Sequence, residues 1–276
     1  MKKYISIILV VFVLAGCERQ EDVDIDVPYK KKLVAAVFIG AGDSLINATL
    51  TYTTPVFGAV PAMDAKYATS ATGVLSYNGL ATDFNYDSMN LNYTAFTLPH
   101  YALAGETYQV NFDDKELSIN GKTTIPFPVT MDIQMEFDSS ENLTLPQYRA
   151  TFTCRVTGDF PAYVRIFPVL VMDDSLTFMP MYGETFKPIK QLQKGDVFTE
   201  KYIAASAING LYPAFIRCII ITCDEAYARY YNATQGIDFS SIIPGTEPLQ
   251  VYSNMSNHIG IIASYNVCGE VVFDVK

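Results

Sequence analysis

Along most of the chain, apolar and polar residues alternate with the period of two that is typical of β-strands. The clearest stretch is Val129–Phe137, in which every second residue is apolar and the residues between them are polar. Such a strand buries one face and exposes the other, as in an antiparallel sheet. Strand-like patterns recur at residues 46–52, 107–112, 148–157, 162–172, 197–204, 214–222, 259–265 and 270–275. The pattern predicts a mainly β protein.

Two segments depart from this alternation. Residues 33–39 are apolar throughout, which is typical of a strand covered on both faces. Residues 225–232 form a helix-like run behind Asp224, a residue type that caps helix N-termini. Glu225 adds an acid in the first turn, where the helix dipole favours one. We therefore expect one short helix among many strands.

The predicted helix carries a stripe of tyrosines. Tyr227, Tyr230 and Tyr231 are spaced by three and four residues, so they share one side of a helix. The stripe has two interpretations. It forms a packing face with its hydroxyls at the rim, the commoner use of tyrosine, or it presents rings to a ligand or partner.

The N-terminus combines a cationic start with a short apolar run. Lys2 and Lys3 precede the apolar residues 4–13, and the pattern is typical of a secretory signal. The run is shorter than the roughly 20 apolar residues that a membrane-spanning helix needs. It ends in Leu14-Ala-Gly-Cys17, which resembles the lipobox of bacterial lipoproteins. The resemblance implies a signal peptide at 1–16 and a lipidated Cys17. An ordinary cleaved signal and an uncleaved anchor are the alternatives.

An acidic segment follows Cys17. Residues 18–26 contain five acids in nine positions, too many charges to bury apolar area, so residues 17–31 are predicted to be a solvated tether. Acids directly behind a lipidated cysteine also resemble the surface-export signals of Bacteroidota lipoproteins.

Further along, Ile125–Pro128 holds two prolines that interrupt a strand ladder. We place a domain boundary there, which gives β-rich domains at 32–126 and 127–276.

Charge and cysteine content narrow the function. The chain has 19 Lys and Arg against 29 Asp and Glu, and removing Lys2 and Lys3 with the signal takes the net charge from −10 to −12. This balance argues against nucleic acid and against a polybasic lipid-binding patch.

Beyond Cys17 there are four cysteines, which could pair in three ways in an oxidising compartment or remain buried thiols: Cys154, Cys218, Cys223 and Cys268. Their spacing does not indicate a metal site.

Few residues suggest catalysis. The two histidines, His100 and His258, lie in predicted loops, and the sequence lacks a Gly-x-Ser-x-Gly nucleophile elbow. Asp173 and Asp174 are the nearest carboxylate pair, but adjacent strand residues point to opposite faces. We expect neither a catalytic residue nor a metal nor a cofactor. The Asp-Ser-apolar triplets resemble Bacteroidota O-glycosylation acceptors, and their serines are candidate sites: Ser44, Ser88 and Ser175.

Several landmarks resemble one family in their order along the chain. They are Lys32–Ile39, Gly105–Phe112, Thr124–Pro126, the tyrosine helix and Val251–Tyr265. This set resembles the Bacteroidota lipoproteins grouped as DUF4249, over essentially the whole mature chain. The resemblance implies an N-terminal immunoglobulin- or prealbumin-like β-sandwich followed by a second antiparallel β-rich domain.

The resemblance also implies a function. The family has no established enzymatic activity, and its members are commonly encoded beside TonB-dependent outer-membrane receptors. We therefore expect a non-enzymatic, lipid-anchored outer-membrane protein, exposed at the cell surface, that captures a ligand for such a receptor. The alternative is a stand-alone adhesin or glycan-binding lipoprotein. The ligand, the partner and the oligomeric state stay open.

Overall fold

The computed structural model describes residues 30–54, 66–97, 101–140, 147–173, 177–185, 187–204, 212–235 and 252–275. The chain divides into two compact units, Met1–Lys30 and Lys31–Lys276. The strands and the helix of the described residues lie in the second unit. Among these residues, no helix is both long and apolar enough to cross a membrane. The signal peptide and Cys17 lie outside the described residues.

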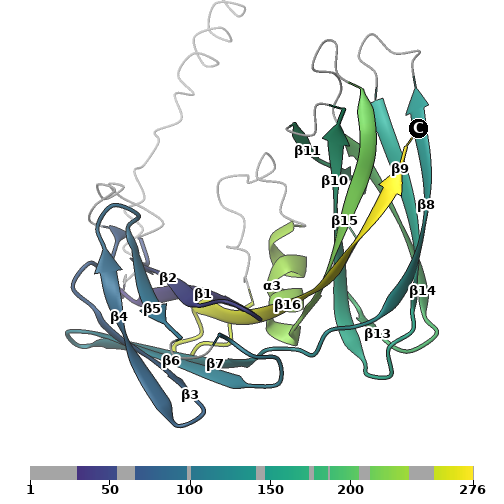
Figure 1. Cartoon of the computed structure of the whole chain (residues 1–276). Helices are drawn as coiled ribbons and strands as arrows, with labels where there is room; N and C mark the ends of the chain where they lie inside the picture. The colour runs from purple at the N-terminus through teal and green to yellow at the C-terminus, as the bar shows by residue number, and fades with distance from the viewer. Residues whose placement is uncertain are drawn as a thin grey trace, which may run out of the picture. The chain divides into compact units, whose positions relative to one another are not determined.

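The first seven strands surround one hydrophobic core (Figure 1). In sheet order they run β1-β2-β5-β4-β3-β6-β7. Their bounds are β1 (Leu33–Gly40), β2 (Leu45–Tyr52), β3 (Thr72–Tyr77), β4 (Leu80–Asp87), β5 (Asn92–Phe96), β6 (Thr107–Asp114) and β7 (Leu117–Thr124). Alternation builds the core directly, because Tyr108, Val110 and Phe112 of β6 are fully buried, while Thr107 and Gln109 on either side of Tyr108 are exposed.

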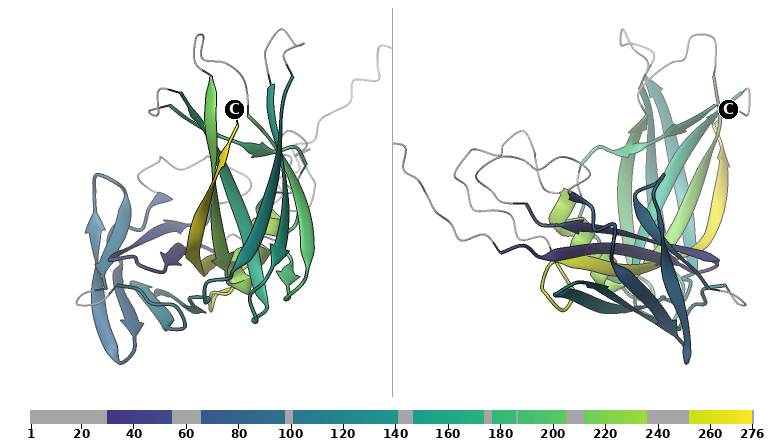
Figure 2. Two further views of the ribbon diagram at one scale, coloured as in Figure 1. Left: turned by 45° about the vertical axis from the view of Figure 1, so that its right-hand side comes forward. Right: turned by 90° about the vertical axis from the view of Figure 1, so that its left-hand side faces the viewer.

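The next strands form two layers around a second core (Figure 2). One layer is the four-stranded sheet β12-β14-β9-β8, and the other is the part β11-β10-β15-β16 of a twelve-stranded sheet. The bounds are β8 (Met131–Ser140), β9 (Gln147–Val156), β10 (Ala162–Met172), β11 (Phe178–Pro180), β12 (Tyr182–Gly183), β13 (Gln191–Leu192), β14 (Val197–Ala204) and β15 (Pro213–Cys223). The predicted mainly β fold, with a second antiparallel β-rich part, is confirmed.

The last strand joins the two cores. β16 (Gly260–Asp274) is 15 residues long. Its first residues pair in parallel with β1, from Ala35 opposite Gly260 onward, and its later residues pair antiparallel with β15. The sequence predicted two strands here, at 259–265 and 270–275, whereas the structure has one continuous strand. The domain boundary near residue 126 stays a prediction, and the structure adds that β16 belongs to both cores.

The helix α3 (Glu225–Gln235) confirms the predicted helix. Asp224 caps it, because its Oδ1 accepts the backbone N–H of Tyr227 at 2.7 Å. Its other oxygen accepts the hydroxyl of Thr123 on β7, and its N–H donates to the carbonyl of Ser264 on β16 at 3.0 Å. Burial raises the pKa of the Asp224 carboxyl, and the hydrogen bonds that the carboxyl accepts from Thr123 and Tyr227 act against that rise. The cap thus fixes the helix to both strands.

A buried carboxylate ties β2 to β6. Asp114 is 3% exposed, and it accepts hydrogen bonds from the hydroxyl of Tyr52 and from Ser70 Oγ, the latter at 2.9 Å. The hydrogen bond from Tyr52 is the main cause that lowers the pKa of Asp114. Burial and the neighbouring Asp114 raise the pKa of Tyr52 to about 12, so the tyrosine is the donor and the aspartate the acceptor at neutral pH.

Asp114→Asn is expected to lower the free energy of unfolding at pH 7 by about 1–3 kcal/mol, because a buried hydrogen-bonded charge is lost. The pKa of Asp114 is lower in the folded state than the value of about 3.9 in the unfolded chain, so the ionised carboxyl stabilises the fold fully above that pH. This stabilisation is lost as the pH falls through the pKa of the folded state. The variant should therefore show a shallower loss of stability below about pH 4 in urea titrations. Asp113→Asn, at an exposed neighbouring position, is the matched control; an equal effect there would contradict the prediction.

Candidate functional site

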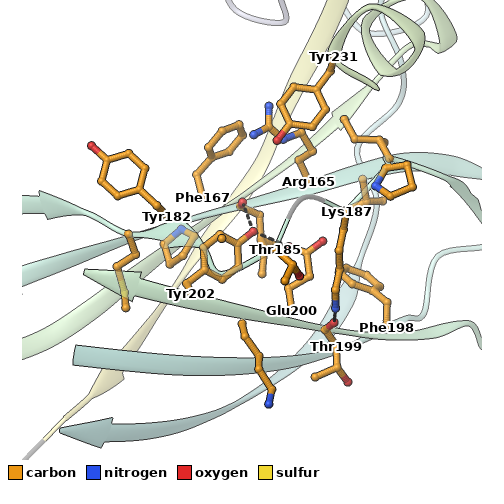
Figure 3. Close-up of a pocket in the computed structure, with 18 of the residues that line it drawn as sticks. Arg165, Phe167, Tyr182, Thr185, Lys187, Phe198, Thr199, Glu200, Tyr202 and Tyr231 are labelled. Atoms are coloured by element: carbon orange, nitrogen blue, oxygen red, sulfur yellow. Dashed lines mark hydrogen bonds between the residues drawn. The ribbon is translucent and has the colours of Figure 1, made fainter. Parts of the chain in front are cut away.

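A cavity of about 820 Å³ lies at one edge of the second core (Figure 3). Strand β10 forms one wall and β14 the other. The crossing segment, residues 180–185 and 187–192, contains β12 and β13, pairs with β14 and β10, and lines the cavity on a third side. Tyr231 of α3 reaches it from the helix. The volume is within the range of about 300–1,000 Å³ that is usual for small-molecule sites.

The cavity exists because the edge of β10 is only partly paired. β13 pairs with it at Ala162 and Tyr163, and β11 pairs with it at Val169–Val171. The edge between these pairings, residues 164–168, lines the cavity. Pro168 lacks an N–H and cannot complete a ladder there. A local break in strand pairing therefore opens this wall.

Arg165 is the best-positioned charged group of the lining. Its guanidinium carbon lies 3.8 Å from the ring centroid of Tyr231 and 4.2 Å from that of Phe167. Its Nη1 donates to the hydroxyl of Tyr227 at 3.2 Å. Cation–π contacts of this kind hold a guanidinium without neutralising its charge. The strand and the helix thus fix a cation at the cavity.

The opposite wall carries a hydroxyl and a carboxylate in contact. The hydroxyl of Tyr202 donates to the carbonyl of Ile166 at 3.1 Å, and it also contacts the Glu200 carboxylate at hydrogen-bond distance. Burial raises the pKa of Tyr202 far above its ordinary value, and the charge of Glu200 adds to the rise. The hydroxyl therefore stays neutral. From the crossing segment, Lys187 donates to the carbonyl of Thr199.

The charged groups of the lining are mainly basic. The lining contains four cations, Arg165, Lys187, Lys190 and Lys201, and one carboxylate, Glu200. Glycosidase chemistry uses a pair of carboxylates, and this lining carries one. Within the described part of the chain, no group of three or more His, Cys, Asp or Glu residues could hold a metal ion.

The structure distributes the three predicted tyrosines over two adjoining clusters, and Tyr227 belongs to both. Tyr227 and Tyr231 pack beside the cluster of Ile189, Cys223 and Ala228. The ring of Tyr230 lies 6.0 Å from that of Phe38 on β1. The stripe is thus mainly a packing face, and within it only Tyr231 lines the cavity.

The remaining predicted sites lie elsewhere. Ser44 and Ser88 are exposed on turns next to β2 and β4, whereas Ser175 is outside the described residues. The four cysteines within the described residues are free thiols. Burial raises the pKa of Cys154, Cys218 and Cys223 to about 12, which keeps these thiols protonated and inert.

The sequence analysis missed the cavity residues on β10 and β14. Arg165 had a signal, because it is the one charged residue inside the otherwise apolar strand at 162–172. Glu200 and Tyr202 had none, since they occupy ordinary positions in an alternating strand. Glu200 and Tyr202 line the same cavity as Arg165 only because of the way in which the two layers face each other.

Comparison with known proteins places the chain in a family. A family model described as a domain of unknown function, DUF4249, matches residues 20–269. Among curated proteins, none matches the sequence. The match spans most of the chain and confirms the resemblance found in the order of the motifs. The chain therefore belongs to the DUF4249 family.

Proposed function

We propose that this chain is a non-enzymatic, lipid-anchored binding protein of the outer membrane that captures a small ligand and passes it to a TonB-dependent receptor. The observation that carries the proposal is the cavity of about 820 Å³ between β10 and β14. It combines apolar walls with a few fixed polar groups, which is the usual composition of a ligand site. Its single carboxylate favours binding over catalysis.

The N-terminal sequence supports a position at the membrane surface. Acyl chains on Cys17 would contribute about 0.8 kcal/mol for each buried CH₂ group. The tether of residues 17–31 has an upper length of about 50 Å when fully extended. That reach lets a ligand-binding body stay attached while it contacts a neighbouring receptor.

The receptor partnership predicts a complex that survives gentle extraction. When the tagged full chain is extracted from native membranes in mild detergent, a TonB-dependent β-barrel receptor should co-purify and be identified by mass spectrometry. An unrelated lipoprotein of the same membrane with the same tag is the control, and it should not retain the receptor. A clean monomer from native membranes would contradict the partnership.

The stand-alone glycan-binding alternative has weaker support. It depends on freely presented tyrosine rings, whereas Tyr227 and Tyr230 both pack edge-on against Phe38 with ring centroids 6.0 Å apart. Both rings are partly buried and held against Phe38, so they are not freely presented to a sugar.

A further inference from the structure

We infer that the cavity binds a small organic anion with a flat ring system, and that its anionic group lies at Arg165. The inference rests on the proposed binding function and adds the ligand class. It is carried by three features of the lining: the placement of the cations, the backbone of β10 and the aromatic walls.

The cations of the cavity contrast with the charge of the whole chain. The chain has a net charge of −10, yet the lining carries four basic residues against one acid. An acidic protein repels anions at long range, so attraction to the site must come from groups in contact with the ligand. Arg165 suits this role, because its contact with Tyr227 uses one of the five N–H donors of a guanidinium.

The edge of β10 adds a backbone donor beside this arginine. The carbonyl of Ile166 accepts the Tyr202 hydroxyl, and the carbonyl of Pro168 accepts the N–H of Met181 at 3.1 Å. The N–H and C=O of one strand residue point to the same side, and this side alternates along the strand. The N–H of Ile166 therefore points to this edge between the pairings with β13 and β11, where a carboxylate or sulfonate can accept it.

The walls favour a ring-bearing ligand body. Five aromatic side chains from β10, β12, β14 and α3 line the cavity: Phe167, Tyr182, Phe198, Tyr202 and Tyr231. Aromatic rings stack in offset or edge-on geometry on flat partners. Figure 3 shows Tyr231 and Arg165 on one side of the cavity and Tyr202 with Glu200 on the other. The anionic group is expected near Arg165, away from the carboxylate.

A matched pair of probes tests the charge requirement. The probes are 2-naphthoate and 2-naphthamide, which share ring and shape and differ in charge. Binding is measured by calorimetry on the full lipidated chain in nanodiscs, with empty nanodiscs as the blank. Naphthoate should bind with 1:1 stoichiometry and about tenfold tighter than naphthamide, because a charge-assisted hydrogen bond replaces a neutral one. High salt should weaken only naphthoate binding.

Four variants locate the site. Arg165→Gln should remove the preference for naphthoate, whereas Glu200→Gln should strengthen naphthoate binding about threefold by removing a like charge. Lys122→Gln, an exposed lysine on β7, makes the same charge change as Arg165→Gln outside the cavity and should alter neither affinity. Thr185→Trp should fill the cavity and block both probes. Circular dichroism checks that each variant is folded. If Arg165→Gln unfolds, the effect of Glu200→Gln on naphthoate binding tests the location of the site instead.

The outcomes separate the two proposals. Equal binding of both probes, blocked by Thr185→Trp, overturns the anion inference and leaves the cavity as a binding site. Failure of both probes to bind overturns the proposed capture function with it. Naphthoate binding that Thr185→Trp leaves intact places the site elsewhere and overturns the inference.

Discussion

Gly260→Ala is expected to lower the free energy of unfolding of the full chain by about 3 kcal/mol or more. Gly260 opens β16 with a φ of +109°, a conformation that residues with a Cβ rarely adopt. A Cβ at this position would lie 2.4 Å from the carbonyl oxygen of Ala35 and 2.9 Å from its nitrogen. Both obstacles are backbone atoms of β1, so the two strands must separate. Urea unfolding followed by circular dichroism measures the loss.

Gly79→Ala separates the strain of a positive φ from the collision. Gly79 lies in the turn between β3 and β4 with a φ of +76°, and a Cβ there would meet no atom within 4 Å. The expected cost is about 1 kcal/mol, the price of the left-handed conformation alone. Equal costs for the two variants would show that the approach of β16 to β1 is not what requires a glycine.

The parallel pairing of β1 with β16 marks what the sequence could and could not predict. Alternation in Val129–Phe137 and in 107–112 is a local pattern, and it identified strands β8 and β6 correctly. The partner of a strand is not local, because Ala35 and Gly260 lie more than 200 positions apart and no motif relates them. The predicted antiparallel sheets therefore did not include the parallel pairing of β1 with β16, which joins the two cores.

The apolar run at 33–39 predicted a strand covered on both faces, and the structure shows what covers each face. β1 buries Leu33, Ala35, Val37 and Ile39 in the first core. Its other face carries Ala36, which packs against the cluster of helix α3 and β16 residues around Ala226 and Ile261. The run is apolar on both faces because a sheet core covers one and a helix covers much of the other. The sequence predicted that both faces of the strand are covered, but not that helix α3 covers one of them.

The cavity was less accessible to prediction than the strands. Its polar groups come from β10, the crossing segment, β14 and α3, and they meet only after the two layers close. A charged residue in an apolar strand is a usable signal for such a site, because burying an unpartnered charge is costly. The tyrosine stripe was the weaker signal, since helical periodicity shows which residues share a face but not what that face contacts.

Cys17→Ser is expected to abolish lipid attachment and outer-membrane localisation. Lipidation requires the sulfur atom of the residue that follows Leu14-Ala-Gly16, and a serine hydroxyl is a much weaker nucleophile at neutral pH. Without acyl chains the mature chain carries a net charge of −12, counted without Lys2 and Lys3, so anionic headgroups repel it. The variant should lose labelling by a palmitate analogue and should leave the outer-membrane fraction almost completely.

Cys268→Ser is the matched control for that loss, because it makes the same change at a free, partly buried thiol on β16. Labelling and fractionation of this variant should equal those of the natural chain. If Cys17→Ser still took up the label and still fractionated with outer membranes, the chain would be held there by something other than its N-terminal thiol. The receptor partnership would then lose its anchor, whereas ligand binding in the cavity, which depends on β10 and β14, would be unaffected. The two halves of the proposed function can therefore fail separately.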